Sequence, residues 1–280
     1  IGSIIATEED YENCYKKLST KPIGDRLKTI LSTKTVVFVG FSFGDEDLNK
    51  IIEILSDDLG QFANQFYLVT IDEKWLDKHP KNIIPIITDG TFFVKSLKNE
   101  LIQQGSLIDS MVYRFAEEAN EILINTHLSW MDDAKFHEIL QEYPELLLTI
   151  AYQDGLIHAF QFSIADEKSG RILMPNYARD VAHSYLYLCN QRMSENNYLQ
   201  AFYDRGYSDG FLALKIFVQG KKEDILFPPM FFFDDKNFAD LESLLSYLKD
   251  NRNQKIYKYC KEKVTLYKSG DNPHFMPWFC

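Results

Sequence analysis

The chain has 280 residues and a formal net charge of −11, with 30 Lys and Arg against 41 Asp and Glu. Hydrophobic residues make up 45% of it, which is enough for a sizeable core, and the length suits about two domains. The acidic balance argues against direct binding of DNA or RNA, because affinity for phosphate needs clustered Lys and Arg.

The cysteines indicate the redox state of the cellular compartment, and the apolar segments indicate whether the chain crosses a membrane. No two of the four cysteines are close enough in sequence for a Cys-x-x-Cys zinc site: Cys14, Cys189, Cys260 and Cys280. Scattered thiols fit a reducing compartment, so we expect a cytoplasmic protein. No apolar run reaches the roughly 18 residues that a membrane helix needs, so no membrane span is expected.

The first hundred residues predict alternating strands and helices, the order typical of a parallel α/β sheet. Thr7 followed by three acidic residues predicts an N-cap and the first turn of a helix. Pro85 indicates that the third strand lies at an edge or is irregular. Beyond the helix opened by Thr7, the predicted helices cover residues 25–31, 45–57, 75–78 and 92–104, and the predicted strands cover 35–39, 66–71 and 82–89.

Gly105 and Ser106 form a plausible hinge, after which the pattern becomes mainly helical. Helices are predicted over residues 111–128, 134–140, 175–193, 197–217, 238–251 and 254–267. Residues 146–164 are ambiguous, with a break at Gly155 and a candidate strand over 156–164. The aromatic residues 227–233 predict a loop or irregular segment.

The predicted fold class is therefore α/β, with a partial Rossmann-like parallel sheet and a mainly α-helical C-terminal domain. The sheet belongs to a domain of residues 1–104 and the helices to a domain of residues 107–280. Three strands make a small sheet, and the chain starts at Ile1 rather than at Met. We therefore expect that this is a fragment whose front half is missing.

The most informative motif follows the strand over 35–39, which runs into Gly40-Phe41-Ser42-Phe43-Gly44-Asp45. The glycines let the backbone turn sharply, and Asp45 can cap the next helix. Ligands bind at such strand-to-helix crossings, where free N–H groups and the helix dipole attract phosphate or ribose oxygens. The motif therefore predicts one edge of a nucleotide site.

Two other interpretations of this motif stay open. It also reads as Gly-x-Ser-x-Gly, the nucleophile pattern of α/β-hydrolases, with Ser42 as the nucleophile. That pattern is short, and no histidine sits in a recognisable strand-end loop, so a nucleotide site is favoured. A tight turn without a ligand is the other interpretation. No metal is expected, because His127 and His137 are ten residues apart without the carboxylate spacing of a metal site.

Four segments occur in order along the first hundred residues: Ile4-Ile5-Ala6-Thr7-Glu8-Glu9-Asp10-Tyr11, Val36 to Asp45, Tyr67 to Asp72, and Asn82 to Ile86. Together they resemble the C-terminal half of the sirtuin-like domain found in bacterial antiphage defence proteins. The resemblance covers residues 1–104, and residues 107–280 resemble no family that we can name.

The resemblance implies a Rossmann-like domain that binds NAD and cleaves its nicotinamide–ribose bond. By its motifs, Gly40, Phe41 and Ser42 contact the adenosine ribose, and Thr70 and Asp72 match the polar strand end that binds the adenosine. Phe41 stands where true sirtuins have Thr. A carboxylate at a strand end is a common partner of a ribose diol, because it accepts two hydrogen bonds.

The same resemblance leaves catalysis unassigned in this chain. The family's glycine-rich phosphate loop and its catalytic Asn, Asp and His precede the segment at Ile4 to Tyr11, so they are expected upstream of Ile1. The implied whole protein is an oligomeric NAD hydrolase of antiphage defence that takes NAD as its substrate and needs no metal. Its implied candidate partners are further copies of itself, a separate ATPase and a phage-derived trigger protein. The alternative function is a non-catalytic nucleotide-binding regulatory or assembly module.

Overall fold

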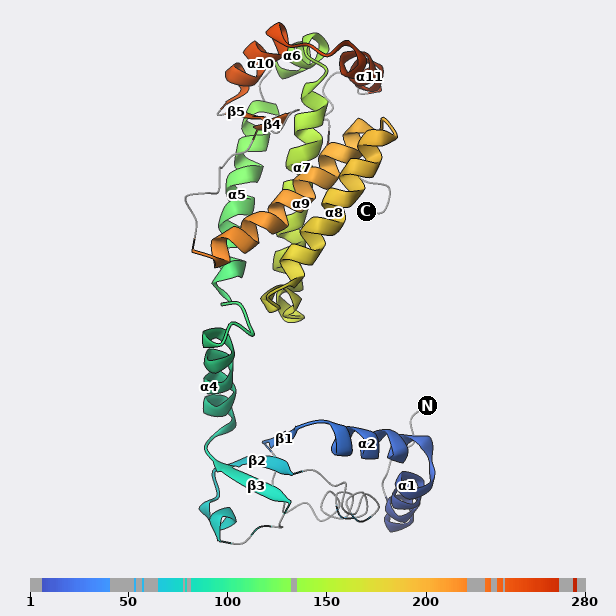
Figure 1. The fold of residues 1–280 in the computed structure, drawn as a ribbon, viewed down its shortest axis with the longest axis vertical. Coiled ribbons are helices and arrows are strands. Elements are labelled where there is room, and N and C mark those ends of the chain that lie inside the picture. The colour runs from blue at the N-terminus through green and yellow to red at the C-terminus, as the bar shows by residue number, and fades with distance from the viewer. Residues whose placement is uncertain are drawn as a thin grey trace. The chain divides into compact units, whose positions relative to one another are not determined.

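The structure is a computed structural model that describes residues 7–40, 53, 57, 65–77, 79, 82–131, 135–220, 230–232, 236–238, 240–266 and 274–275 (Figure 1). The chain divides into two compact units, residues 1–100 and residues 101–280. The assignment of distinct roles to domains 1–104 and 107–280 stays a prediction.

The first unit contains the three predicted strands and helices before and after them, whereas the predicted helix over 45–57 lies outside the described residues except for 53 and 57. In chain order its elements are α1 (Glu8–Thr20), α2 (Pro22–Thr33), β1 (Val36–Val39), β2 (Phe66–Thr70), the 3-10 helix η2 (Glu73–Leu76), β3 (Ile83–Ile87) and α4 (Gly90–Gln103). A capping box opens α1: the Thr7 hydroxyl accepts from the Asp10 amide at 3.2 Å, and the Asp10 carboxylate accepts from the Thr7 amide at 3.1 Å. The predicted helix start at Thr7 is thereby confirmed.

The three strands of the first unit form one parallel sheet in the order β1-β2-β3. In the register, Val36 lies opposite Phe66, and Phe66 lies opposite Ile83. This confirms the predicted parallel α/β class. It also places Pro85 on an edge strand of the described sheet, where its missing N–H disturbs the ladder least.

A continuous apolar run such as residues 35–39 predicts a strand buried on both faces, and this prediction was wrong. Val37 and Val39 of β1 are 37% and 41% exposed, whereas Phe66 and Leu68 of β2 are fully buried. The reason is position: β2 is paired on both sides, and β1 pairs with β2 along one edge. Among the strands that the structure describes, none pairs with the other edge of β1.

The second unit is mainly helical, as predicted. Its elements are α5 (Met111–Met131), α6 (Phe136–Glu142), α7 (Leu146–Ala165), the 3-10 helices η3 (Asp166–Lys168) and η4 (Arg171–Leu173), α8 (Tyr177–Ser194), α9 (Tyr198–Val218), β4 (Met230–Phe232), β5 (Lys236–Phe238), α10 (Leu241–Asp250) and α11 (Gln254–Val264). The core forms where α7 packs against α5 and α9, and α9 packs against α8 (Figure 1).

Helix α7 corrects the prediction for residues 146–164. The segment is one continuous helix of 20 residues, so the expected strand over 156–164 does not form, and Gly155 lies inside the helix without breaking it. Fifteen of its residues are buried. A helix surrounded by protein on all sides carries no amphipathic period, which is why its sequence pattern resembled that of a buried strand.

A second correction concerns the aromatic residues 227–233, which were predicted to be a loop or irregular. Met230–Phe232 forms strand β4, which pairs with Lys236–Phe238 of β5 in a short antiparallel sheet. Helix α10 consequently begins at Leu241, three residues after its predicted start.

Candidate functional site

The carboxyl ends of β1, β2 and β3 lie along one edge of the sheet, because the three strands are parallel. Gly40 directly follows β1, Thr70 is the last residue of β2, and Asp72 comes two residues later. The register places Val39 opposite Val69 and Thr70 opposite Ile87. The structure therefore brings three of the five predicted site residues to the edge at which parallel sheets bind ligands.

Gly40 turns the chain away from β1. Its φ of +72° lies in the left-handed region, which glycine adopts without strain and other residues rarely do. Apart from its chain neighbours, no residue that the structure describes has a heavy atom within 4 Å of the position that a Cβ atom would take there. Gly40 therefore ends the strand with a sharp turn and leaves open space beside its backbone.

Local hydrogen bonds hold Thr70 and Asp72 at the end of β2. The Thr70 hydroxyl accepts from the Asp72 amide at 3.1 Å, and the Asp72 Oδ1 accepts from the Lys74 amide at 3.1 Å, which caps η2. Asp72 is exposed and Thr70 is half-buried. A carboxylate has about four acceptor sites, so one cap bond is compatible with further bonds to sugar hydroxyls.

The end of β3 adds a residue that sequence reasoning did not single out. Asp89 follows β3, and its Oδ1 accepts from the Phe92 amide at 2.9 Å, which caps the first turn of α4. A Cβ atom at Gly90 would lie 2.9 Å from a methyl group of Val39, so the start of α4 lies against the end of β1. The acidic residue and glycine after an apolar strand were the signal for this helix start.

Phe41 and Ser42, the other two predicted site residues, lie outside the described residues, and so does Asp45. Their contacts with a nucleotide, the cap role of Asp45 and the hydrolase interpretation of Ser42 all stay predictions.

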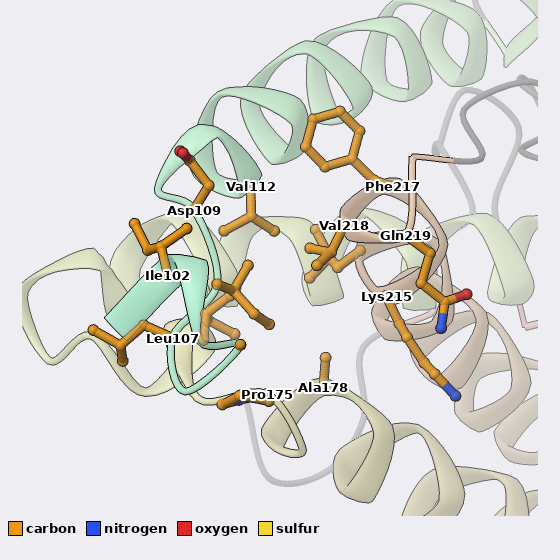
Figure 2. Close-up of a pocket in the computed structure, with 14 residues that line it drawn as sticks. Ile102, Leu107, Asp109, Val112, Pro175, Ala178, Lys215, Phe217, Val218 and Gln219 are labelled. Carbon is orange, nitrogen blue, oxygen red and sulfur yellow. The ribbon is translucent and has the colours of Figure 1, made fainter. Parts of the chain in front are cut away.

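The second unit contains a hollow of about 400 Å³ between the chain that leads into α5 and the end of α9. Figure 2 shows Val112, Val218 and Ala178 around this hollow, with Lys215 extending away from it. The Asp109 Oδ1 accepts from the Met111 amide at 2.8 Å, which caps α5. The hollow is large enough for a small ligand, but its lining is mainly apolar, and we assign no reaction to it.

The structure brings together a group of residues that the sequence analysis did not connect. His127 of α5, Asp154 of α7 and His274 of the C-terminal segment place their polar atoms within 4.8 Å of one another. His158 lies nearby, with its Nδ1 3.0 Å from the Tyr203 hydroxyl. Burial lowers the pKa of His158, which fits a neutral, hydrogen-bonded core histidine. The partners of His127 are far from it in sequence, so no local pattern could have revealed the group.

Among the helices that the structure describes, none combines the length and the apolar character needed to cross a membrane.

Comparison with known proteins bears on the first unit. No curated protein and no solved structure matches the chain. A family described as the SIR2-like domain has a model that matches residues 1–84, a range that contains all five predicted site residues. SIR2-like domains bind NAD. Residues 1–84 are thus similar to the NAD-binding SIR2-like domain, and the rest of the chain is unassigned.

Proposed function

We propose that the first unit binds NAD by its adenosine half at the carboxyl edge of the sheet. The observation that carries the proposal is that Gly40, Thr70 and Asp72 meet at one sheet edge, inside the segment that matches the SIR2-like domain. A sheet edge of this kind is a common place for nucleotides, and the matched family is one that binds NAD.

Each proposed residue has a physical role. Gly40 lets the backbone approach the nucleotide closely, because it has no side chain and takes the left-handed conformation. Asp72 accepts hydrogen bonds from ribose hydroxyls, and Thr70 fixes the Asp72 backbone through the 3.1 Å bond to its amide. Phe41 and Ser42 complete the adenosine side, with the Ser42 hydroxyl bonded to a sugar oxygen.

We further propose that the whole protein carrying this domain hydrolyses NAD. In that reaction the bond between nicotinamide and ribose breaks, nicotinamide leaves, and water adds to the oxocarbenium-like ribose. The products are nicotinamide, ADP-ribose and a proton. No described residue at the sheet edge is assigned to bond cleavage, and the resemblance implies that the family's catalytic Asn, Asp and His carry out this step.

The proposed biological setting is antiphage defence, in which depletion of NAD stops the infected cell. The resemblance to sirtuin-like defence proteins supports this setting, together with self-assembly, a partner ATPase or a phage-derived trigger. It is tested by measuring NAD and phage yield in bacteria that express the intact protein or an empty vector. NAD should fall only in infected cells that carry the protein. Unchanged NAD and unchanged phage yield would contradict the proposal.

Binding is tested by isothermal titration calorimetry of the 280-residue chain with ADP-ribose and with nicotinamide mononucleotide. The first ligand carries the adenosine half of NAD, and the second carries only the nicotinamide half. We expect ADP-ribose to bind and nicotinamide mononucleotide not to bind. If nicotinamide mononucleotide bound and ADP-ribose did not, the site would bind the nicotinamide half of NAD, and the proposal would be wrong.

Hydrolysis is tested by following NAD consumption in two samples, this chain and the intact protein, at equal concentration and with their assembly states measured. Consumption by the intact protein alone supports the proposal. If the 280-residue chain consumes NAD on its own, a catalytic residue lies within it. The alternative is a nucleotide-binding module without turnover, and it is supported by the lack of an assigned cleavage residue among the described residues of the sheet edge. It predicts ADP-ribose binding with no consumption in either sample.

A further inference from the structure

Three side chains in the second unit form a nearly equilateral triangle of polar atoms. The Nε2 of His127 lies 3.3 Å from the Nδ1 of His274, and this Nδ1 lies 3.1 Å from the Oδ1 of Asp154. The third side, from the His127 Nε2 to the Asp154 Oδ1, measures 3.4 Å. Imidazole nitrogens and a carboxylate oxygen are ligands that zinc binds.

The size of the triangle fits one face of a tetrahedron around a metal ion. Zinc–nitrogen and zinc–oxygen bonds of about 2.0–2.1 Å give distances of about 3.3–3.4 Å between ligands in a tetrahedral site. Bonds of the same length in an octahedral site give about 2.8–3.0 Å between neighbouring ligands. Two sides of the triangle match the tetrahedral value, and the third, at 3.1 Å, lies between the two geometries.

Outer contacts orient two of the three ligands. The Nδ1 of His127 lies 2.8 Å from the Gln153 Oε1. An amide oxygen can only accept, so the Nδ1 donates and the Nε2 turns its lone pair toward Asp154 and His274. The Phe275 amide donates to the Asp154 Oδ2 at 2.7 Å, which leaves Oδ1 for the triangle. Metal-binding histidines and carboxylates are held by outer hydrogen bonds of this kind.

Burial of the triangle means that its carboxylate needs partners, and a cation is one partner that would satisfy it. His127 is 2% exposed and Asp154 is 5% exposed. A carboxylate taken out of water is stable only when it is paired, hydrogen-bonded or bound to a metal. The side chain of His274 is 40% exposed, so the third corner of the triangle reaches solvent. That leaves a side from which an ion could enter and a water molecule could complete the coordination.

We propose that His127, Asp154 and His274 bind one zinc-type divalent cation, with water as the fourth ligand. The ion would tie the C-terminal segment to α5 and α7, because His274 lies 147 residues after His127 and 120 residues after Asp154. The ring of Phe275 packs against Tyr203 of α9, with 5.6 Å between the ring centres, so the segment also has an apolar contact in this place. The cation thus fastens residues 274–275 onto the helical core.

The direct test is a titration of the untagged, chelator-treated 280-residue chain with Co²⁺ and then with Zn²⁺. We expect one equivalent of Co²⁺ to give the intense visible absorption of a four-coordinate ion and Zn²⁺ to displace it. Zn²⁺ should also raise the midpoint of thermal unfolding. The alternative is a cluster that shares a proton between His274, Asp154 and His127 with no ion. It predicts no stoichiometric Co²⁺ signal, and this result would overturn the proposal.

Three variants and one control sharpen the test. His274→Ala and Asp154→Asn each remove a ligand and should abolish the Co²⁺ absorption. His274 is partly exposed in the C-terminal segment, so its replacement leaves the helical core to fold. Gln153→Ala should weaken Co²⁺ binding by about 10–100-fold, because it removes an orienting bond and no ligand. The matched control His183→Ala, at an exposed position of α8, should bind as the parent does. Unchanged binding by His274→Ala and Asp154→Asn would also overturn the proposal.

Discussion

Gly206 of α9 lies so close to Tyr152 of α7 that a Cβ atom at Gly206 would overlap the Tyr152 carbonyl oxygen. The relationship is reciprocal, because a Cβ atom at Gly155 of α7 would overlap the Tyr203 carbonyl oxygen of α9. Two glycines thus let two buried helix backbones touch. The overlapping groups are backbone, which cannot move aside as the end of a side chain can.

We expect Gly206→Ala to lower the free energy of unfolding by about 3 kcal/mol or more, at the upper end of overpacking in a core, because the two helices must separate. Urea unfolding monitored by circular dichroism measures the loss. Gly220→Ala is the control: Gly220 has a φ of +74°, and apart from its chain neighbours no described residue has an atom within 4 Å of the added group. It should lose only about 1–2 kcal/mol, from backbone strain. Equal losses in the two variants would mean that α7 and α9 are not in close contact.

Asp204 of α9 predicts a pH dependence of stability. Burial raises its pKa to about 6 from 3.8, although a hydrogen bond from Gln200 at 2.8 Å and the charge of Arg192 lower it. Between about pH 4 and pH 6 the folded chain therefore holds a proton that the unfolded chain has released. The free energy of unfolding falls as pH rises through this window, by up to about 3 kcal/mol, and this contribution stays lost above it.

Asp204→Asn tests this dependence, because the amide is neutral and its oxygen can still accept from Gln200. At pH 7.5 the variant should be more stable than the parent by up to about 3 kcal/mol, and the difference should shrink toward pH 4. Urea unfolding at several pH values measures it. Asp250→Asn, at the exposed end of α10, is the control for the change in charge and should show a small, pH-independent effect. A parallel response of both variants would contradict the assignment to Asp204.

Arg252 neutralises a buried carboxylate between α6 and α7. Its Nε donates to the Glu145 Oε1 at 3.0 Å, and its Nη2 donates to the Glu142 carbonyl oxygen at 2.9 Å. Glu145 is 1% exposed, and burial raises its pKa. We expect Arg252→Ala to lower the free energy of unfolding by about 3 kcal/mol, because it leaves this carboxyl group buried without its partner.

The double variant Arg252→Ala with Glu145→Gln should recover part of that loss, because the buried group no longer carries a charge. Arg114→Ala is the comparison, since the Arg114–Glu118 pair is largely exposed and should contribute about 0.5 kcal/mol at most. Chemical unfolding of the three variants at pH 7.5 measures these differences. No recovery in the double variant would show that the arginine acts through packing on Tyr257, whose ring centre is 4.4 Å away, and not through charge.

Asp72 tests the proposed NAD site. Asp72→Asn can keep the cap on Lys74, because an amide oxygen also accepts, but it removes the negative charge and one strong acceptor. We expect the affinity for ADP-ribose to fall by about tenfold or more, as hydrogen bonds to charged groups are worth about 1.5–3 kcal/mol. Calorimetry measures it. Asp77→Asn, an exposed acid at the end of η2, should bind ADP-ribose like the parent. Equal affinities of the two variants would remove Asp72 from the site.

Much of the fold could be predicted from local sequence signals. These signals each lie within a few neighbouring residues. They are the apolar runs that form β1, β2 and β3, the capping box at Thr7, and the helical periodicity of α8 and α9. The carboxyl edge with Gly40, Thr70 and Asp72 follows from them, because parallel strands end at the same side. The sequence could therefore predict that a nucleotide binds at the carboxyl edge of the sheet. The binding measurements identify the ligand.

The tertiary structure decided what depends on neighbours that are distant in sequence. The segment of helix α7 was ambiguous in the sequence, with a break expected at Gly155, because burial on every side removes the helical period. The glycine in fact lies inside the helix, where α9 crosses it. His127, Asp154 and His274 meet only because α5, α7 and the C-terminal segment pack together. Local sequence determines the elements through backbone geometry and capping. Packing decides which side chains meet in the core. His274, for example, contacts His127 and Asp154, which lie more than a hundred positions before it.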